Sequence, residues 1–150
     1  MNVLAVDPAT RTGFAYLTGQ NLEVGVLDLR LPKRSSQGEA FRFFSRWLHE
    51  LIDENSIDVL IFERAYGFRK GSEFLGGLAA ICHCQDDRVA VMEANVSSLK
   101  KFATGKGNAD KSMMIEAAKN YGYSTSDDNE ADAFLLLEYF RRNGKKIPPD

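Results

Sequence analysis

The chain opens with a short apolar segment that ends in an acidic residue. Residues 3–6 are all apolar, and Asp7 and Pro8 follow them directly. A run that is apolar at every position predicts a strand buried on both faces. Because Pro8 cannot continue a hydrogen-bond ladder, the chain must leave the sheet there. Asp7 is therefore predicted to sit on a rigid support with open space in front of it, although a turn-capping role would explain the same position.

The next segments predict an α/β fold. Strand patterns over residues 14–18 and 22–31 follow with short turns between them, which predicts an antiparallel meander with the first strand. A helical apolar stripe over residues 38–54 leads to a second buried strand over 57–62, which ends in Glu63. A strand, helix and strand in this order form a parallel, right-handed βαβ unit.

The second half of the chain adds helices and one more strand. The predicted helices cover residues 72–84, 96–103, 111–121 and about 127–142, and the predicted strand covers 88–92. The expected fold is a mixed central sheet, with a three-strand antiparallel meander plus parallel strands, flanked by helices on both faces. With 150 residues and no linker or repeat, residues 1–150 are predicted to form one domain with a frayed tail over 144–150.

Composition excludes several classes of protein. Cys82 and Cys84 flank His83, but ligands two residues apart on a helix point to nearly opposite sides, and no second cluster completes a zinc site. Both are predicted to be buried free thiols of a reducing compartment. No apolar run approaches the roughly 20 residues that span a bilayer, and the chain starts directly with a strand. A cytoplasmic protein without a membrane partner is expected.

Three acids stand at the ends of buried elements. Asp7 and Glu63 end two strands that we expect to be neighbours, and Asp132 lies on the inward face of the last helix. Carboxylates packed this closely raise one another's pKa, and a divalent cation removes that penalty. Oxygen donors without His or Cys favour Mg²⁺ or Mn²⁺ over Zn²⁺. Two such ions can activate a water and stabilise the leaving oxygen at a phosphodiester.

Basic residues gather in two segments just past these strand ends. The first contains Arg64, Arg69 and Lys70, interleaved with Tyr66 and Phe68, and the second contains Lys100, Lys101, Lys106 and Lys111. They predict contacts to DNA phosphates, while a solvated charged face explains the same pattern. The formal net charge of -2 does not oppose this prediction, because acids at a metal site offset basic contacts in the sum.

The order of these motifs resembles the RuvC-type Holliday-junction resolvases. The resemblance runs from residue 2 to about 142, through Leu-Ala-Val-Asp-Pro at Asp7, Ile-Phe-Glu-Arg-Ala at Glu63, Gly-Asn-Ala-Asp-Lys-Ser at Lys111, and Asp-Asn-Glu-Ala-Asp-Ala from Asp128. The short length and the last motif are more similar to phage-encoded members, which would act in the cytoplasm of a bacterial host. The resemblance implies an RNase H-like fold, a homodimer, Mg²⁺ dependence with Mn²⁺ as a substitute, and symmetric nicking of four-way DNA junctions.

The resemblance also implies roles for single residues. It makes Asp7, Glu63 and Asp132 metal ligands. The family's fourth ligand stands three residues before the last acid, which is Asn129 here, whereas Asp128 lies one residue further back. Both stay open as the fourth ligand, and Asp128 is favoured because a charged oxygen holds a hard cation better.

Two further residues match the family. Lys111 matches a lysine close to the scissile phosphate, where it could stabilise developing charge. Tyr66 matches the position of an aromatic residue that stacks on a base at the junction centre.

Other functions fit parts of the sequence. The segment from Asp7 to Gly13 resembles the first phosphate loop of sugar kinases and actin-like ATPases, although those enzymes need a second lobe. A junction-binding protein without chemistry would keep the basic segments but could lose its acids. A nuclease for other branched DNA, such as forks or flaps, is the closest alternative.

Overall fold

The computed structural model describes residues 1–30, 32, 36–64 and 72–144. Its strands are β1 (Val3–Asp7), β2 (Arg11–Thr18), β3 (Asn21–Asp28), β4 (Val59–Glu63) and β5 (Ala90–Ala94). Its helices are α1 (Gln37–Glu54), α2 (Ser72–His83), α3 (Val96–Thr104), α4 (Lys111–Asn120) and α5 (Asp128–Asn143). The predicted element types and their order are confirmed. The predicted tail lies outside the described residues from 145 onward.

The strands form one mixed sheet in the order β3-β2-β1-β4-β5. β1, β2 and β3 pair antiparallel, while β1 pairs with β4 and β4 with β5 in parallel. The meander and the βαβ unit are therefore as predicted. Val6 pairs with Phe62, so the next residue of each strand, Asp7 and Glu63, lies at the same edge of the sheet.

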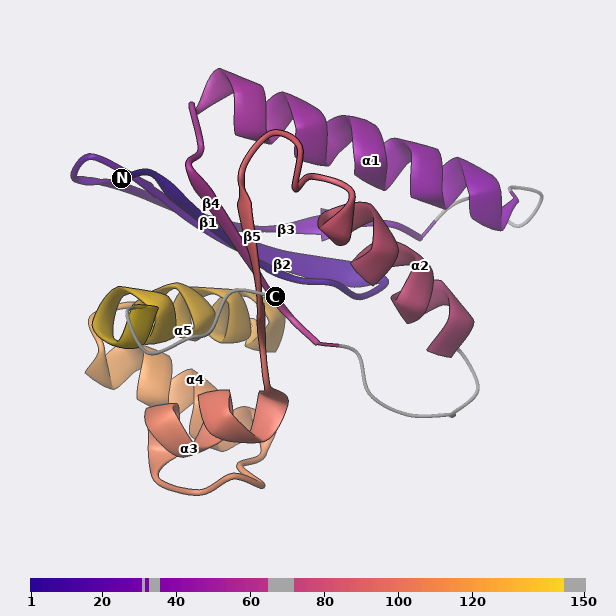
Figure 1. The fold of residues 1–150 in the computed structure, drawn as a ribbon. Helices are drawn as coiled ribbons and strands as arrows, with labels where there is room; N and C mark the ends of the chain where they lie inside the picture. Colours follow the sequence, from indigo (N-terminus) through magenta and orange to yellow (C-terminus); the bar gives the residue numbers. More distant parts are fainter. Residues whose placement is uncertain (31, 33–35, 65–71, 145–150) are drawn as a thin grey trace.

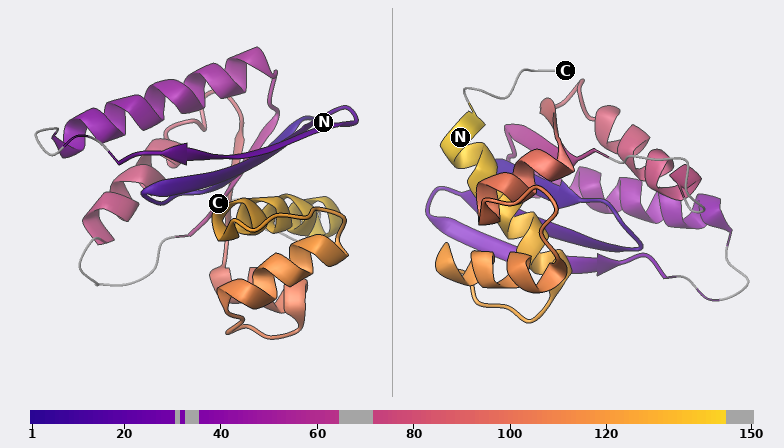
Figure 2. Two further views of the ribbon diagram at one scale, coloured as in Figure 1. Left: turned by 180° about the vertical axis from the view of Figure 1, so that it is seen from behind. Right: turned by 90° about the horizontal axis from the view of Figure 1, so that it is seen from below.

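Helices cover both faces of this sheet, with α1 and α2 on one side and α3, α4 and α5 on the other (Figures 1 and 2). Leu4 and Phe62 pack with Phe44 of α1 in the first core. Ala5 and Ile61 pack against the α5 side in the second core. Successive strand residues point to opposite faces, which explains why β1 and β4 are apolar until their last residue.

Most of helix α5 is buried. It is buried from Ala133 through Glu138, because it lies against β1 and β2 and is covered by α4. Asp127 caps its start, and its Oδ1 accepts from the backbone N–H of Asn129 at 2.8 Å. Arg11, at the start of β2, pairs with Asp127 at 2.9 Å. The first turn of α5 is thereby tied to the turn that follows Asp7.

Several smaller predictions can be compared with the fold. Cys82 is buried and free, as predicted, and burial raises its pKa. Cys84 is also free but exposed, so its predicted burial is wrong, because it follows the end of α2 in a surface turn.

Gly77 gives α2 a close contact with α1, where an added Cβ would lie 2.4 Å from the Phe41 ring. In the described part of the chain, no helix is long and apolar enough to span a membrane.

Candidate active site

Four acidic side chains meet at one edge of the sheet. Asp7 ends β1, Glu63 ends β4, and Asp128 and Asp132 stand one turn apart at the start of α5. The carboxyl groups of Asp7 and Glu63 share a hydrogen bond, and the charge of Asp128 acts on both Asp7 and Asp132. The structure therefore brings together segments that lie far apart in the sequence.

The electrostatics of this group oppose its full ionisation. Burial raises the pKa of Asp7 well above its ordinary value, and the neighbouring Glu63 and Asp128 raise it further. Burial likewise raises the pKa of Glu63. It raises the pKa of Asp132 to about 7, with the charges of Asp7 and Asp128 adding to the effect. The fold therefore keeps protons on these acids to higher pH than the unfolded chain does, because their ionised forms would repel one another.

The donor set fits a hard divalent cation. It consists of carboxylate oxygens, and Oδ1 of Asp132 is buried without a hydrogen-bond partner among the described residues. Within the same residues, no group of three or more Asp, Glu, His or Cys side chains is already arranged to hold a metal ion. The cation would supply the compensating charge that the acids lack.

The two candidates for the fourth ligand are adjacent residues in the first turn of α5. The backbone of Asn129 faces β2, where its carbonyl would lie 2.0 Å from a Cβ added to Gly13. Asp128 lies one turn before Asp132, and its charge raises the pKa of both Asp7 and Asp132. The choice of Asp128 over Asn129 as the fourth ligand stays a prediction.

Two lysines stand beside the acids. Nζ of Lys111, the first residue of α4, is 3.2 Å from Oδ2 of Asp128. Lys100 of α3 lowers the pKa of Asp7, Glu63 and Asp132, although less than burial raises it. Sequence reasoning placed Lys100 in a basic segment just past the strand ends, as a DNA contact, but did not single it out as a lysine that acts on the acids. Its position could have been inferred from β5, which ends beside β4 and leads directly into α3.

Gly13 is a second residue that sequence reasoning missed. It pairs with Asp7 in the register of β1 and β2. Its missing side chain lets α5 approach so closely that an added Cβ would lie 2.0 Å from the carbonyl oxygen of Asn129 and 3.3 Å from Cβ of Ala133. This close approach sets the distance between Asp7 on the sheet and Asp132 on the helix.

The predicted DNA contacts are only partly described. Lys101 and Lys106 are exposed on α3 and just after it. Arg64 forms an ion pair with Glu93 rather than extending alone into solvent. Tyr66, Arg69 and Lys70 lie outside the described residues, so their roles stay predictions.

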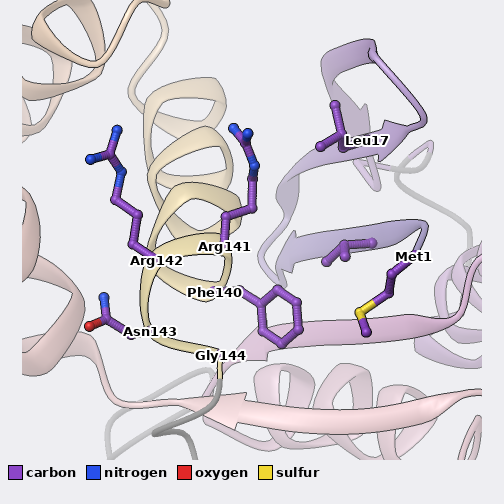
Figure 3. A pocket seen from close by; sticks show the side chains of 8 residues that line it. Met1, Leu17, Phe140, Arg141, Arg142, Asn143 and Gly144 are labelled. Atoms are coloured by element: carbon purple, nitrogen blue, oxygen red, sulfur yellow. The ribbon is translucent and has the colours of Figure 1, made fainter.

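A cavity of about 660 Å³ lies at the opposite end of the molecule from the acids. Its lining comes from the start of β1, the end of β2 and the end of α5, and Figure 3 shows Phe140 and Met1 facing each other across it. Asp7 lies at the other end of β1, and Asp128 and Asp132 lie near the other end of α5. β1 alone separates the two places by roughly 13 Å at 3.3 Å per residue. The cavity is therefore separate from the candidate active site.

The raised pKa of Asp132 predicts a stability that falls as pH rises. The acid titrates near 3.8 in the unfolded chain and at about 7 in the fold, so the native state holds the extra proton between these values. In EDTA, the melting temperature is expected to be several degrees higher at about pH 5 than at about pH 8. Asp28, whose pKa is lowered to about 2, makes stability vary with pH only below this window. Thermal unfolding across pH, with Asp132→Asn as the comparison, measures the effect.

Wild type and Asp132→Asn should differ mainly in the slope of this profile. The variant is expected to be flatter between pH 5 and 8, because one of the three raised carboxyl groups has been removed. Parallel profiles would contradict the assignment of a raised pKa to Asp132.

Comparison with known proteins places this geometry in context. No family model matches the chain. The structure of Thermus thermophilus RuvC is similar over 100% of both chains, with 17% identity and a TM-score of 0.74. RuvC from the same organism in complex with a Holliday junction substrate has 15% identity and a TM-score of 0.79, over 100% of this chain and 99% of that one. The yeast mitochondrial Holliday junction resolvase has 11% identity and a TM-score of 0.60, over 96% of this chain and 85% of that one.

These similarities establish the fold. The chain has the RNase H-like architecture predicted from its motifs, and its structural neighbours are the resolvases that its sequence resembles. Identities of 11–17% do not carry activity or site residues from those proteins to this chain. The phage origin and the cytoplasmic location stay predictions.

Proposed function

We propose that this chain is a divalent-metal-dependent endonuclease that resolves four-way DNA junctions by symmetric nicking. The observation that carries the proposal is the meeting of Asp7, Glu63, Asp128 and Asp132 at one sheet edge beside Lys111. The full-length similarity to a RuvC solved with a Holliday junction supports it. The same similarity favours a nuclease over a phosphate-binding ATPase lobe.

Each acidic residue has a proposed role in this reaction. Asp7, Glu63 and Asp132 would hold Mg²⁺ or Mn²⁺, with Asp128 as the fourth ligand. When bound, the ions would supply an activated water and stabilise the leaving oxygen of the phosphodiester. The acids would hold the positive charge beside the carboxyl ends of β1 and β4, where a fixed charge can stabilise the transition state.

The lysines and the remaining basic surface would act on the DNA. Lys111 would contact an oxygen of the scissile phosphate and stabilise the charge that develops there. Lys100 would add positive charge from the α3 side. Exposed Lys101 and Lys106 would contact backbone phosphates, which suits recognition by shape and charge rather than by base edges. Because symmetric nicking needs two equivalent sites, the chain would act as a homodimer.

Cleavage of a labelled synthetic four-way junction tests this proposal. Linear duplex, fork and flap substrates built from the same sequences serve as controls, each with Mg²⁺ and with EDTA. We expect paired nicks in the junction only with the metal, at a rate on the order of 10³-fold above that for duplex. Equal cutting of junction and duplex would remove the junction specificity. A preference for forks or flaps would favour the alternative class of branched DNA.

A further inference from the structure

A second cluster of charged side chains lies at the same edge of the sheet, on the opposite face from the acids. It consists of Arg64, directly after β4, Glu93 of β5 and His83 at the end of α2. Successive residues of a strand point to opposite faces. Glu63 therefore faces the α5 side, whereas Phe62 belongs to the core under α1 and α2, and Arg64 points the same way.

Glu93 links the parts of this cluster. Its side chain is only 12% exposed, compared with 48% for Arg64 and 45% for His83. Oε1 of Glu93 is 2.5 Å from Nε2 of His83, and Oε2 accepts a hydrogen bond from Nε of Arg64. A nearly buried carboxylate with a partner on each oxygen is costly to leave unpaired.

The cluster holds the residues on both sides of Glu63. Before it, the Phe62 ring meets the His83 ring edge to face, with 5.0 Å between centroids. After it, Arg64 is held through its side chain by Glu93 and through its backbone, where its N–H donates to the Ala94 carbonyl at 2.9 Å. Glu63 thus sits on a strand end that is fixed on both sides.

We propose that Glu93 and Arg64 are positioning residues for the carboxylate of Glu63, and that Arg64 serves the strand end rather than the DNA backbone. This inference rests on the proposed function and reassigns a residue that the sequence predicted as a DNA contact. A ligand set must be held to within about 0.5 Å of its working geometry by its supporting residues. Fixing both neighbours of Glu63 does this without any contact between the cluster and the metal or the DNA.

Two measurements on Glu93→Gln and Arg64→Met test the inference. The first is Mn²⁺ binding by calorimetry, and the second is the salt dependence of junction affinity in EDTA. We expect Mn²⁺ affinity to fall about 10-fold or more in both variants, as it does when residues that orient metal ligands are lost. Junction affinity is expected to stay within about twofold of wild type. The slope of log affinity against log salt concentration, the salt slope, is expected to be unchanged. Junction cleavage by both variants should fall in parallel with Mn²⁺ affinity.

Lys101→Met is the matched control, because Lys101 is an exposed basic residue on α3 at the same end of the molecule. It is expected to do the reverse, lowering the salt slope by about one while leaving Mn²⁺ affinity unchanged. The double variant Arg64→Met with Glu93→Gln should lose no more Mn²⁺ affinity than the worse single variant, because the pair acts as a unit.

Two results would overturn the inference. One is a lowered salt slope and weaker junction binding in Arg64→Met, with Mn²⁺ affinity unchanged, which would make Arg64 a phosphate contact. The other is tighter junction binding by Glu93→Gln, as expected if Glu93 only restrains a DNA-binding arginine. If Glu93→Gln does not fold, Arg64→Met alone decides between these outcomes. A wild type that binds Mn²⁺ but cuts no junction would overturn the proposed function while leaving this test intact.

Discussion

Replacing Asp7 with asparagine is expected to reduce junction cleavage by about 10³-fold or more, because the metal's contribution to transition-state stabilisation is several kcal/mol. The same change is expected to raise the melting temperature in EDTA. Burial and the charges of Glu63 and Asp128 raise the pKa of Asp7, so its ionised form destabilises the fold at neutral pH. A neutral asparagine of the same size removes that repulsion.

Cleavage assays and thermal unfolding on the same protein preparation measure both effects. Asp87→Asn is the matched control, because Asp87 is exposed in the turn before β5 and should leave cleavage and melting temperature unchanged. Junction binding in EDTA is expected to persist in Asp7→Asn. Undiminished cutting by this variant would exclude Asp7 from the site, and a lower melting temperature would contradict the repulsion among the acids.

Gly13→Ala is expected to disrupt the candidate active site by displacing helix α5. The added Cβ would lie 2.0 Å from the carbonyl oxygen of Asn129, which belongs to the backbone of α5 and cannot rotate away. Helix α5 must shift, at a cost of about 3 kcal/mol, as expected for overpacking. Asp128 and Asp132 shift with it, and a displacement of about 1 Å costs on the order of 10²-fold in rate. Chemical denaturation and junction cleavage measure the two effects.

Gly107→Ala provides the control for this experiment. A Cβ added at Gly107 would lie 3.5 Å from its nearest neighbour, in ordinary contact, so its stability is expected to change by less than about 0.5 kcal/mol. If Gly13→Ala kept the stability and cleavage rate of wild type, α5 would not need the close approach that the fold shows.

The backbone of the site could be predicted from the sequence because it follows from strand periodicity. β1 and β4 are apolar at every position until Asp7 and Glu63, and that pattern already places the two acids at strand ends. Asp132 could be predicted as a site residue because a carboxylate among inward-facing apolar residues is costly unless it is paired or binds a metal ion. Each of these signals is local. The rule that a strand, a helix and a strand form a parallel unit then predicted that β1 and β4 are neighbours.

The remaining features depend on side-chain contacts between distant segments. No local pattern marks Gly13 as the place where α5 approaches the sheet. Arg64 looks like a DNA contact in the sequence because nothing near it reveals Glu93, which lies 29 residues later. Lys100 lies beside the acids only because β5 extends the sheet next to β4. Such contacts follow from the complete fold rather than from the pattern of any one element.

Locating Mn²⁺ by anomalous diffraction from crystals soaked in the ion tests the central claim most directly. We expect one or two anomalous peaks between Asp7, Glu63 and Asp132, with carboxylate oxygens at roughly 2.0–2.2 Å and Asp128 as the fourth ligand. The peaks should be lost in crystals of Asp7→Asn. Peaks only elsewhere on the molecule, or acids that stay apart with no ion between them at saturating Mn²⁺, would contradict a metal-dependent nuclease site at this edge of the sheet.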